Sequence, residues 1–204
     1  MTIQIEIKTV NKDCLEVYID EDLVKKAHKK IFGNLSLGRN NFSSLDELEQ
    51  LLIEKEKNGA RSYLARCLGR KNLHSLEADK ILSSLFVSFN TIQEVLMDFK
   101  DKGYLDDARY VTQFIHHHSS RGKGSRWIHQ KLKQIGLEEN EIRMSLHQMD
   151  AHSNQESLSA LITKKSARQD INNPKFKRRL IGFLMRRGFS YEDISKALSI
   201  DEIS

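Results

Sequence analysis

The sequence predicts a mainly α-helical protein: three tandem three-helix modules in an elongated, curved arrangement, preceded by a small N-terminal β-hairpin. Three observations lead to this fold class. The 204 residues contain one proline and ten glycines, so helix breakers are few. Apolar residues follow helical spacing from Ser44 onward and alternate with a period of two only before Asp20. A glycine-centred phrase recurs three times, which is typical of tandem modules.

The N-terminal hairpin is predicted from alternating residues. Apolar and polar residues alternate in two runs, with apolar members Ile3, Ile5, Ile7, Leu15, Val17 and Ile19. Between the runs, residues 11–13 read Asn-Lys-Asp, which favours a turn. Because an isolated hairpin is unstable, its apolar face needs a cover from elsewhere in the fold. Residues 1–43 are predicted to hold this hairpin and a linker that contains Gly33, Gly38, Asn40 and Asn41.

The helical region is predicted to contain three modules, at residues 44–104 with a leading helix, 105–150 and 151–204. Ser44 can cap the leading helix, and Glu47 three residues later completes a capping box. Gly59 indicates either two helices or one helix with a break. Thr91 and Glu94 predict a second capping box.

The recurring phrase predicts sharp corners between packed helices. It occurs at Lys102-Gly103-Tyr104, Ile135-Gly136-Leu137 and Arg187-Gly188-Phe189. A glycine just past a helix can take the left-handed conformation, and the apolar residue after it can fold back onto the last turn. Acidic residues follow each phrase, where the positive N-terminal end of the next helix favours them.

Composition limits the classes of function. The formal net charge of +5 suits contact with nucleic acid or an acidic protein surface, although ordinary solubility explains it equally well. Cys14 and Cys67 lie far apart without metal-ligand spacing, which argues against a disulfide framework or a zinc site. No stretch approaches the roughly 20 apolar residues of a membrane span, and no secretory leader is evident. We therefore expect a cytoplasmic protein without membrane contact.

The sequence offers no convincing catalytic or metal site. His116, His117 and His118 occupy consecutive helical positions, so their side chains point in three directions and cannot converge on one ion. Asp106 and Asp107 are adjacent, yet their position at a helix start favours capping over acid–base chemistry. No glycine-rich phosphate loop or nucleophile elbow is found. The sequence thus predicts no enzyme, no cofactor and no metal.

Two basic segments are better candidates for function. The first, RGKGSRW at 121–127, continues to Lys131 and Lys133 without an acid between. Backbone amides at a helix N-terminus could there bind phosphates or carboxylates together with the basic side chains. Trp127 could stack on a base or belong to the core. In the second segment, 175–187, cations alternate with apolar residues and either contact a partner or form the solvated face of a helix.

Three phrases together resemble the RecX family of recombination regulators: GYLDDARY at 103–110, RGKGSRWI at 121–128 and FLMRRGFS at 183–190. Their order and spacing match the family as well, and the resemblance covers roughly residues 58 to 200. The resemblance implies a bacterial cytoplasmic protein that binds RecA recombinase filaments on DNA, modulates recombination and the DNA-damage response, and usually inhibits RecA. It implies no enzyme.

Five arginines fall on matching positions of the family pattern: Arg109, Arg121, Arg126, Arg186 and Arg187. The sequence departs from the pattern at Trp127 and Ile135, where the family commonly has a basic residue. With the neighbouring cations, the predicted partner-binding set, called here the ten candidate cations, is Arg109, Arg121, Lys123, Arg126, Lys131, Lys133, Arg178, Arg179, Arg186 and Arg187.

A monomer with linked modules could lie in the groove of a filament, where many weak contacts add together. The alternative is a helical module that binds nucleic acid directly and needs no recombinase. Salt separates the two hypotheses, because direct phosphate binding weakens steeply as salt is added.

Overall fold

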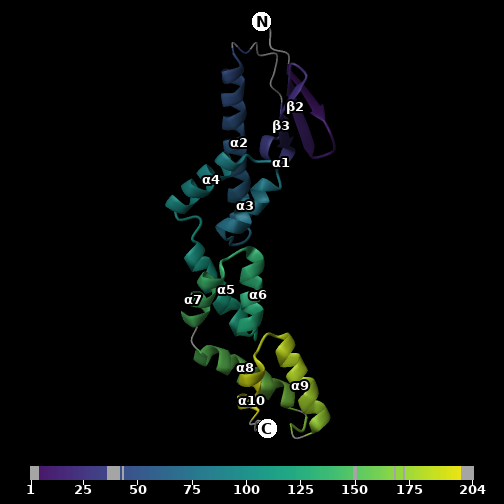
Figure 1. The fold of residues 1–204 in the computed structure, drawn as a ribbon, viewed down its shortest axis with the longest axis vertical. Coiled ribbons are helices and arrows are strands. Elements are labelled where there is room, and N and C mark those ends of the chain that lie inside the picture. The colour runs from purple at the N-terminus through teal and green to yellow at the C-terminus, as the bar shows by residue number, and fades with distance from the viewer. Residues whose placement is uncertain are drawn as a thin grey trace. The chain divides into compact units, whose positions relative to one another are not determined.

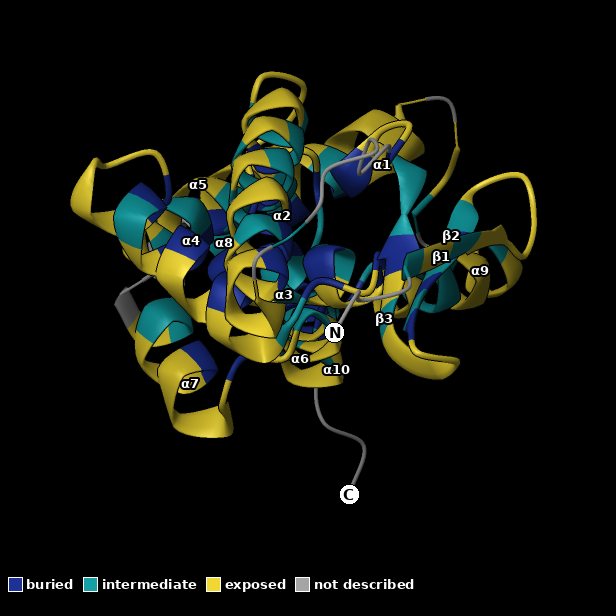
Figure 2. Cartoon of the chain, turned by 90° about the horizontal axis from the view of Figure 1, so that it is seen from above, coloured by how far each residue is buried: buried dark blue, intermediate teal, exposed yellow. Residues whose placement is uncertain are grey.

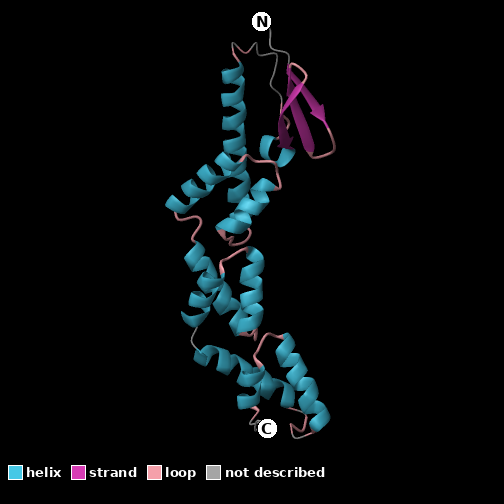
Figure 3. Ribbon diagram, viewed as in Figure 1, coloured by secondary structure: helices cyan, strands magenta, loops and turns pink. Residues whose placement is uncertain are grey.

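The computed structural model describes residues 5–35, 42, 44–148, 151–167, 169–171 and 173–198. The chain forms two compact units, Met1–Asp107 (unit 1) and Ala108–Ser204 (unit 2), whose elements are labelled in Figure 1. Helices predominate in both units, and among the described residues strands occur only before Lys29 (Figure 3). The predicted mainly α-helical class is therefore confirmed. Ile3 and the linker residues Gly38, Asn40 and Asn41 lie outside the described residues.

The predicted hairpin is confirmed by β1 (Ile5–Thr9) and β2 (Cys14–Ile19), which pair antiparallel. The turn between them forms as the sequence indicates, because the Asn11 side chain accepts hydrogen bonds from the amides of Asp13 and Cys14 at 3.0 and 2.9 Å. Such Asx turns favour a tight reversal of the chain.

A third strand, β3 (Asp22–His28), extends the hairpin to a sheet of order β1-β2-β3. The sequence predicted a linker here because the adjacent cations Lys25 and Lys26 interrupt the period of two. The turn before β3 also lacks the usual signal: Asp20 and Glu21 take the positive φ angles of 48° and 74° that glycine or asparagine normally supply.

The first three-helix group consists of α2 (Leu45–Leu68), α3 (Ser75–Ser83) and α4 (Phe89–Asp101), and α1 (Lys29–Phe32) precedes it. Ser44 caps α2 as predicted, since its hydroxyl accepts from the Glu47 amide at 3.2 Å. Helix α2 runs through Gly59 without a break. A Cβ at Gly59 would overlap the backbone carbonyl of Ile31, so this glycine allows α1 to pack closely on α2.

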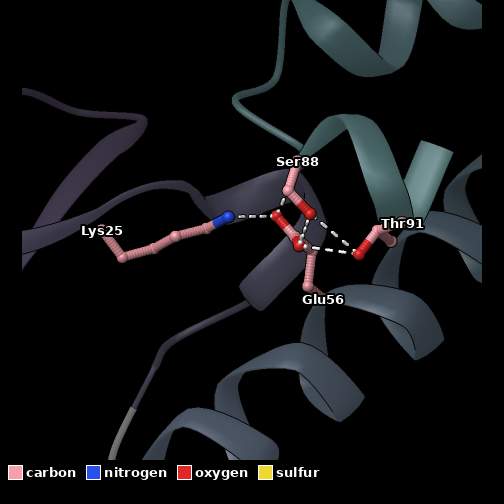
Figure 4. Close-up of polar contacts among 4 residues, drawn as sticks. All are labelled: Lys25, Glu56, Ser88 and Thr91. Carbon is pink, nitrogen blue, oxygen red and sulfur yellow. Dashed lines mark hydrogen bonds and ion pairs between the residues drawn. The ribbon is translucent and has the colours of Figure 1, made fainter.

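The sheet joins the first three-helix group through the buried carboxylate of Glu56, which lies in the middle of α2 (Figure 4). Glu56 accepts hydrogen bonds from Lys25 of β3 at 2.5 Å, from the Ser88 amide and hydroxyl at 3.0 and 2.7 Å, and from Thr91 at 3.0 Å. The predicted capping box at Thr91 and Glu94 is therefore wrong. Helix α4 begins earlier, with Ser88 as its N-cap, and a carboxylate from another helix receives the donors.

Asp107 also caps a helix other than its own. Although it is the first residue of α5 (Asp107–Ser120), its carboxylate accepts from the amide and hydroxyl of Ser75, at the start of α3, at 2.7 and 2.6 Å. Burial would raise the pKa of Asp107, but Lys100 and Ser75 hold it below the ordinary value of 3.8. Asp107 thus caps the start of α3, which is distant in the sequence, in place of the start of its own helix.

Unit 2 contains the second and third three-helix groups, each with its own apolar core. The second group is α5, α6 (Ser125–Ile135) and α7 (Glu139–Gln148), and the third is α8 (Ala151–Ser166), α9 (Pro174–Arg186) and α10 (Tyr191–Ala197). Helices in both units carry buried positions beside exposed ones, as amphipathic helices do (Figure 2). No described helix has the length and apolar character needed to cross a membrane.

The three predicted glycine corners form, with φ angles of +71° at Gly103, +116° at Gly136 and +92° at Gly188. Gly136 and Gly188 join the second and third helices of their groups. Gly103 instead follows α4 and leads into α5. The corner inside the first group falls at Phe86, a non-glycine residue with φ +60°, which explains why the glycine phrase does not mark it.

Candidate macromolecule-binding surface

The structure places the ten candidate cations on three helices of unit 2 and on the segments that flank them. Arg109 lies on α5, Arg121 and Lys123 follow α5, Arg126, Lys131 and Lys133 lie on α6, Arg178, Arg179 and Arg186 lie on α9, and Arg187 caps α9. Lys123, Lys131 and Arg187 are half-buried, and the other seven are exposed. The α5–α6 loop and the end of α9 are brought into direct contact.

That contact, called here the α6–α9 junction, is made between two stretches of backbone. The Gly124 amide donates to the Arg187 carbonyl at 2.9 Å, and the Arg126 amide donates to the Gly188 carbonyl at 3.1 Å. Both glycines are buried. A Cβ at Gly124 would overlap the Gly188 backbone, and a Cβ at Gly188 would overlap Trp127. Only glycine permits this approach at both positions.

The junction corrects one prediction from the sequence. Amides at the start of α6 were expected to bind phosphates or carboxylates, but those of Gly124 and Arg126 already donate to carbonyls at the end of α9. A backbone amide that is fully used within the fold offers no donor to a ligand. The amides of Gly124 and Arg126 are therefore not available to a partner, and contact through Arg126 depends on its side chain.

Arg187 contributes to the junction through its side chain as well as its carbonyl. Its Nη1 donates to the backbone oxygens of Arg121 at 2.9 Å and of Gly122 at 3.4 Å, just past the end of α5. Its guanidinium also lies 5.2 Å from the ring centroid of Phe183. Arg187 thus positions the α5–α6 loop, and its charge is directed into the fold.

Trp127 belongs to the core, in agreement with one of the two alternatives left open by the sequence. Its half-buried ring packs against the second apolar core. The Lys123 and Lys131 ammonium groups lie 4.3 and 5.7 Å from its centroid, and the His118 ring lies 4.8 Å away. With neighbours of this kind around it, the indole is not an open platform for stacking on a base.

The three consecutive histidines do not form a metal site. No group of three or more histidine, cysteine or carboxylate ligands converges within the described part of the chain. His118 instead packs between Phe114 and Trp127, at ring distances of 4.3 and 4.8 Å. Burial lowers the pKa of His118, and the nearby positive charges of His117, Arg121 and Lys123 lower it further. The neutral ring is therefore favoured at this position.

The exposed cations of unit 2 are poorly compensated by acids. Among the described residues, no ion pair to a carboxylate is formed by Arg121, Lys123, Arg126, Arg178, Arg179, Arg186 or Arg187. Lys133 does pair with Glu139, at 3.5 Å. In unit 1, by contrast, Lys25, Lys57 and Lys100 all pair with carboxylates at 2.5 to 2.8 Å. Uncompensated positive charge is thus concentrated around α6 and α9.

Sequence reasoning missed one cation in this region, Lys165 at the end of α8. Its ammonium group lies 4.9 Å from the ring centroid of Phe183, on α9. The local signal was the pair Lys164-Lys165, but basic residues in the last turn of a helix are expected from the helix dipole alone. Only the packing of α8 beside α9 brings Lys165 next to the basic helix α9.

The repeated three-helix groups place this chain among small proteins built from tandem three-helix domains. The second three-helix domain of RecX matches residues 106–146, and the third matches residues 153–198. A regulatory protein RecX from Pseudomonas entomophila (strain L48) is 30% identical over 132 residues, which span 65% of this chain and 84% of that protein. The chain therefore belongs to the RecX family, as its three phrases indicated.

Two solved structures have a similar fold. A crystal structure of regulatory protein RecX superposes with a TM-score of 0.62 at 18% identity, covering 98% of this chain and 100% of that one. The crystal structure of RecX from Lactobacillus salivarius gives a TM-score of 0.61 at 21% identity, covering 72% of this chain and 94% of that one. Both structures thus share the fold of this chain.

Proposed function

We propose that this protein binds RecA filaments assembled on DNA and inhibits their recombination and DNA-repair activities. The chain belongs to the RecX family, and its relatives are named regulatory proteins. Both facts support this proposal. The observation that carries it further is the set of exposed cations around the start of α6 and on α9 that have no ion-pair partner among the residues that the structure describes. Such cations are attracted to a negatively charged assembly, and a filament that encloses DNA is one.

Charge reversal of Arg121 and Arg126 tests the proposal, because both side chains are exposed and only their backbones take part in the α6–α9 junction. The double variant Arg121→Glu with Arg126→Glu should weaken suppression of RecA-catalysed, DNA-dependent ATP hydrolysis by about tenfold, which corresponds to about 1.4 kcal/mol. Far-UV circular dichroism would confirm that the variant remains folded.

A matched control reverses two exposed cations of unit 1, Lys30→Glu with Lys55→Glu, which changes the net charge by the same amount. Its suppression of ATP hydrolysis should stay within about twofold of the parent protein. Unchanged suppression by the Arg121 and Arg126 variant, or equal losses in both variants, would contradict the proposed surface.

The second candidate function is direct binding of nucleic acid without a recombinase, which the same uncompensated cations favour. In that case the affinity for DNA alone should fall with salt, with a logarithmic slope of about 0.9 per phosphate contacted on duplex DNA and about 0.7 on single strands. Filament binding that exceeds DNA binding at every salt concentration would favour the recombinase.

A further inference from the structure

A pocket of about 340 Å³ opens between α8 and α9 inside the third three-helix group. Helix α9 supplies Phe176, Leu180 and Phe183 to its lining, and Lys165, Gln169 and Arg179 complete it. This volume lies at the small end of the range of about 300–1,000 Å³ for ligand pockets, so it suits one large side chain and not an extended ligand. Apolar walls with a polar rim are typical of anchor sites at protein interfaces.

The charges around the pocket favour a ligand of negative charge. Two of the six lining residues are cations, and none is a carboxylate. Helix α9 also carries five basic residues and no acidic residue between Pro174 and Arg186. The local field is therefore positive, and a negatively charged segment would be attracted to this face.

The aromatic residues of the pocket favour a protein ligand over a nucleic acid. Stacking of a base requires an accessible ring face. Phe176 and Phe183 are half-buried and pack against the third apolar core. In addition, Lys165 and Arg187 lie 4.9 and 5.2 Å from the centroid of Phe183. What the pocket offers is a concave apolar wall, which receives an inserted side chain.

We infer that the α8–α9 pocket binds an acidic peptide segment of a protein partner. One aromatic or large aliphatic side chain of the peptide inserts against Phe176 and Phe183, and flanking carboxylates pair with Lys165 and Arg179. The inference rests on the proposed function, since it assigns part of the contact to the protein of the filament and not to its DNA.

A matched pair of variants isolates the pocket from the general charge of this face. Lys165→Glu with Arg179→Glu reverses the two cations that line the pocket, while Lys164→Glu with Lys175→Glu reverses exposed cations of the same two helices that do not line it. Both double variants change the net charge equally. A difference between them therefore reports on the pocket itself.

The probe is a fluorescein-labelled peptide, Asp-Glu-Asp-Phe-Asp-Glu-Asp, titrated with the full chain and followed by fluorescence polarisation. The peptide with Phe should bind at least about tenfold more tightly than the same peptide with Ala at that position, because the large side chain is buried. The pocket variant should lose about tenfold in affinity for the Phe peptide, and the control variant less than about threefold. This pattern of results would support the inference.

Three results would each contradict peptide binding in the α8–α9 pocket. They are no binding of the Phe peptide, equal affinity for the Phe and Ala peptides, or equal losses of affinity in the pocket and control variants. A thymidine oligonucleotide whose binding is lost only in the pocket variant would also overturn it, in favour of a base site. If the Phe peptide binds but the parent protein has no effect on RecA, the proposed function is contradicted, whereas peptide binding in the pocket is supported.

Discussion

Two contacts between packed parts of the fold, called here joints, are stabilised by different interactions. In unit 1, the buried carboxylate of Glu56 ties the sheet to α4 by accepting from Lys25 and Ser88. In unit 2, backbone hydrogen bonds at Gly124 and Gly188 join the second and third three-helix groups, and the Arg187 side chain donates only to neighbouring backbone carbonyls. The first joint depends on an ionised group, and the second depends on the absence of a Cβ.

Because the two joints depend on different interactions, different changes should destabilise them. A buried charge is stable only while its partners and its ionisation persist, so the Glu56 joint should respond to charge removal and to acid. A close backbone contact has no titrating group, so the α6–α9 junction should respond to added volume.

The largest effect is expected from Gly188→Ala. A Cβ at Gly188 meets left-handed strain, which costs about 1–2 kcal/mol, and overlap with Trp127, which costs about 1–3 kcal/mol. We therefore expect the free energy of unfolding of unit 2 to fall by about 3 kcal/mol. Trp127 is the single tryptophan of the chain and adjoins the site, so urea denaturation followed by its fluorescence measures the loss directly.

Gly103→Ala is the control for strain without overlap. Gly103 has φ +71°, yet a Cβ there would meet nothing within 4 Å. Its cost should be about 1 kcal/mol, measured by urea denaturation followed by far-UV circular dichroism. Similar losses for the two alanine variants would show that the close approach at Gly188 contributes little, which would contradict the account of the junction.

Glu56→Gln tests the other joint and is expected to cost about 2 kcal/mol at pH 7. Glutamine keeps the shape of the side chain but loses the charge-assisted hydrogen bonds from Lys25 and Ser88. The cost stays moderate because the Lys25 side chain is 21% exposed and water can hydrate it. Urea denaturation followed by far-UV circular dichroism measures the loss. Glu49→Gln, an exposed acid of the same helix, should change stability by less than about 0.5 kcal/mol.

The effect of Glu56 should also depend on pH. Burial alone would raise the pKa of Glu56, but hydrogen bonds from Lys25 and Ser88 hold it below its ordinary value of 4.5. Because the folded-state pKa is depressed, this stabilisation is fully present above pH 4.5 and is lost as the pH falls through the folded-state value. The gap between the parent protein and Glu56→Gln should therefore narrow below pH 4.5. A gap that widens in acid would contradict the ionised state.

A smaller effect, of about 1 kcal/mol, is expected from Arg187→Lys. Lysine keeps the charge but cannot reproduce the planar donor that reaches the carbonyls of Arg121 and Gly122. Urea denaturation followed by Trp127 fluorescence measures this change. The neighbouring Arg186→Lys, at an exposed position, should stay within about 0.5 kcal/mol. Equal stability of the two lysine variants would mean that Arg187 does not position the loop.

Features with local causes were predictable from the sequence. The hairpin turn follows from Asn11, and the corners at Gly136 and Gly188 follow from residues within one helical turn. Features that depend on distant residues were not predictable. Glu56 looks like an ordinary surface acid of a helix until Ser88, 32 residues later, folds over it.

The candidate surface divides in the same way. The basic segments around α6 and α9 can be read directly from composition and family phrases, whereas the use of the Gly124 amide depends on a carbonyl at Arg187. The pocket between α8 and α9 was likewise hidden, because it requires Lys165 and Phe183 to approach one another across two helices. Sequence patterns identify side chains with the right chemistry, but packing decides which of their atoms remain available.

Co-sedimentation with RecA assembled on single-stranded DNA, compared with the same DNA alone, tests the proposed function most directly. If the protein binds the filament, it should pellet with RecA–DNA at protein concentrations where DNA alone leaves it in the supernatant. The Arg121→Glu with Arg126→Glu variant should then remain largely soluble. Equal recovery of the parent protein with DNA alone and with the filament would contradict the account and favour direct nucleic-acid binding.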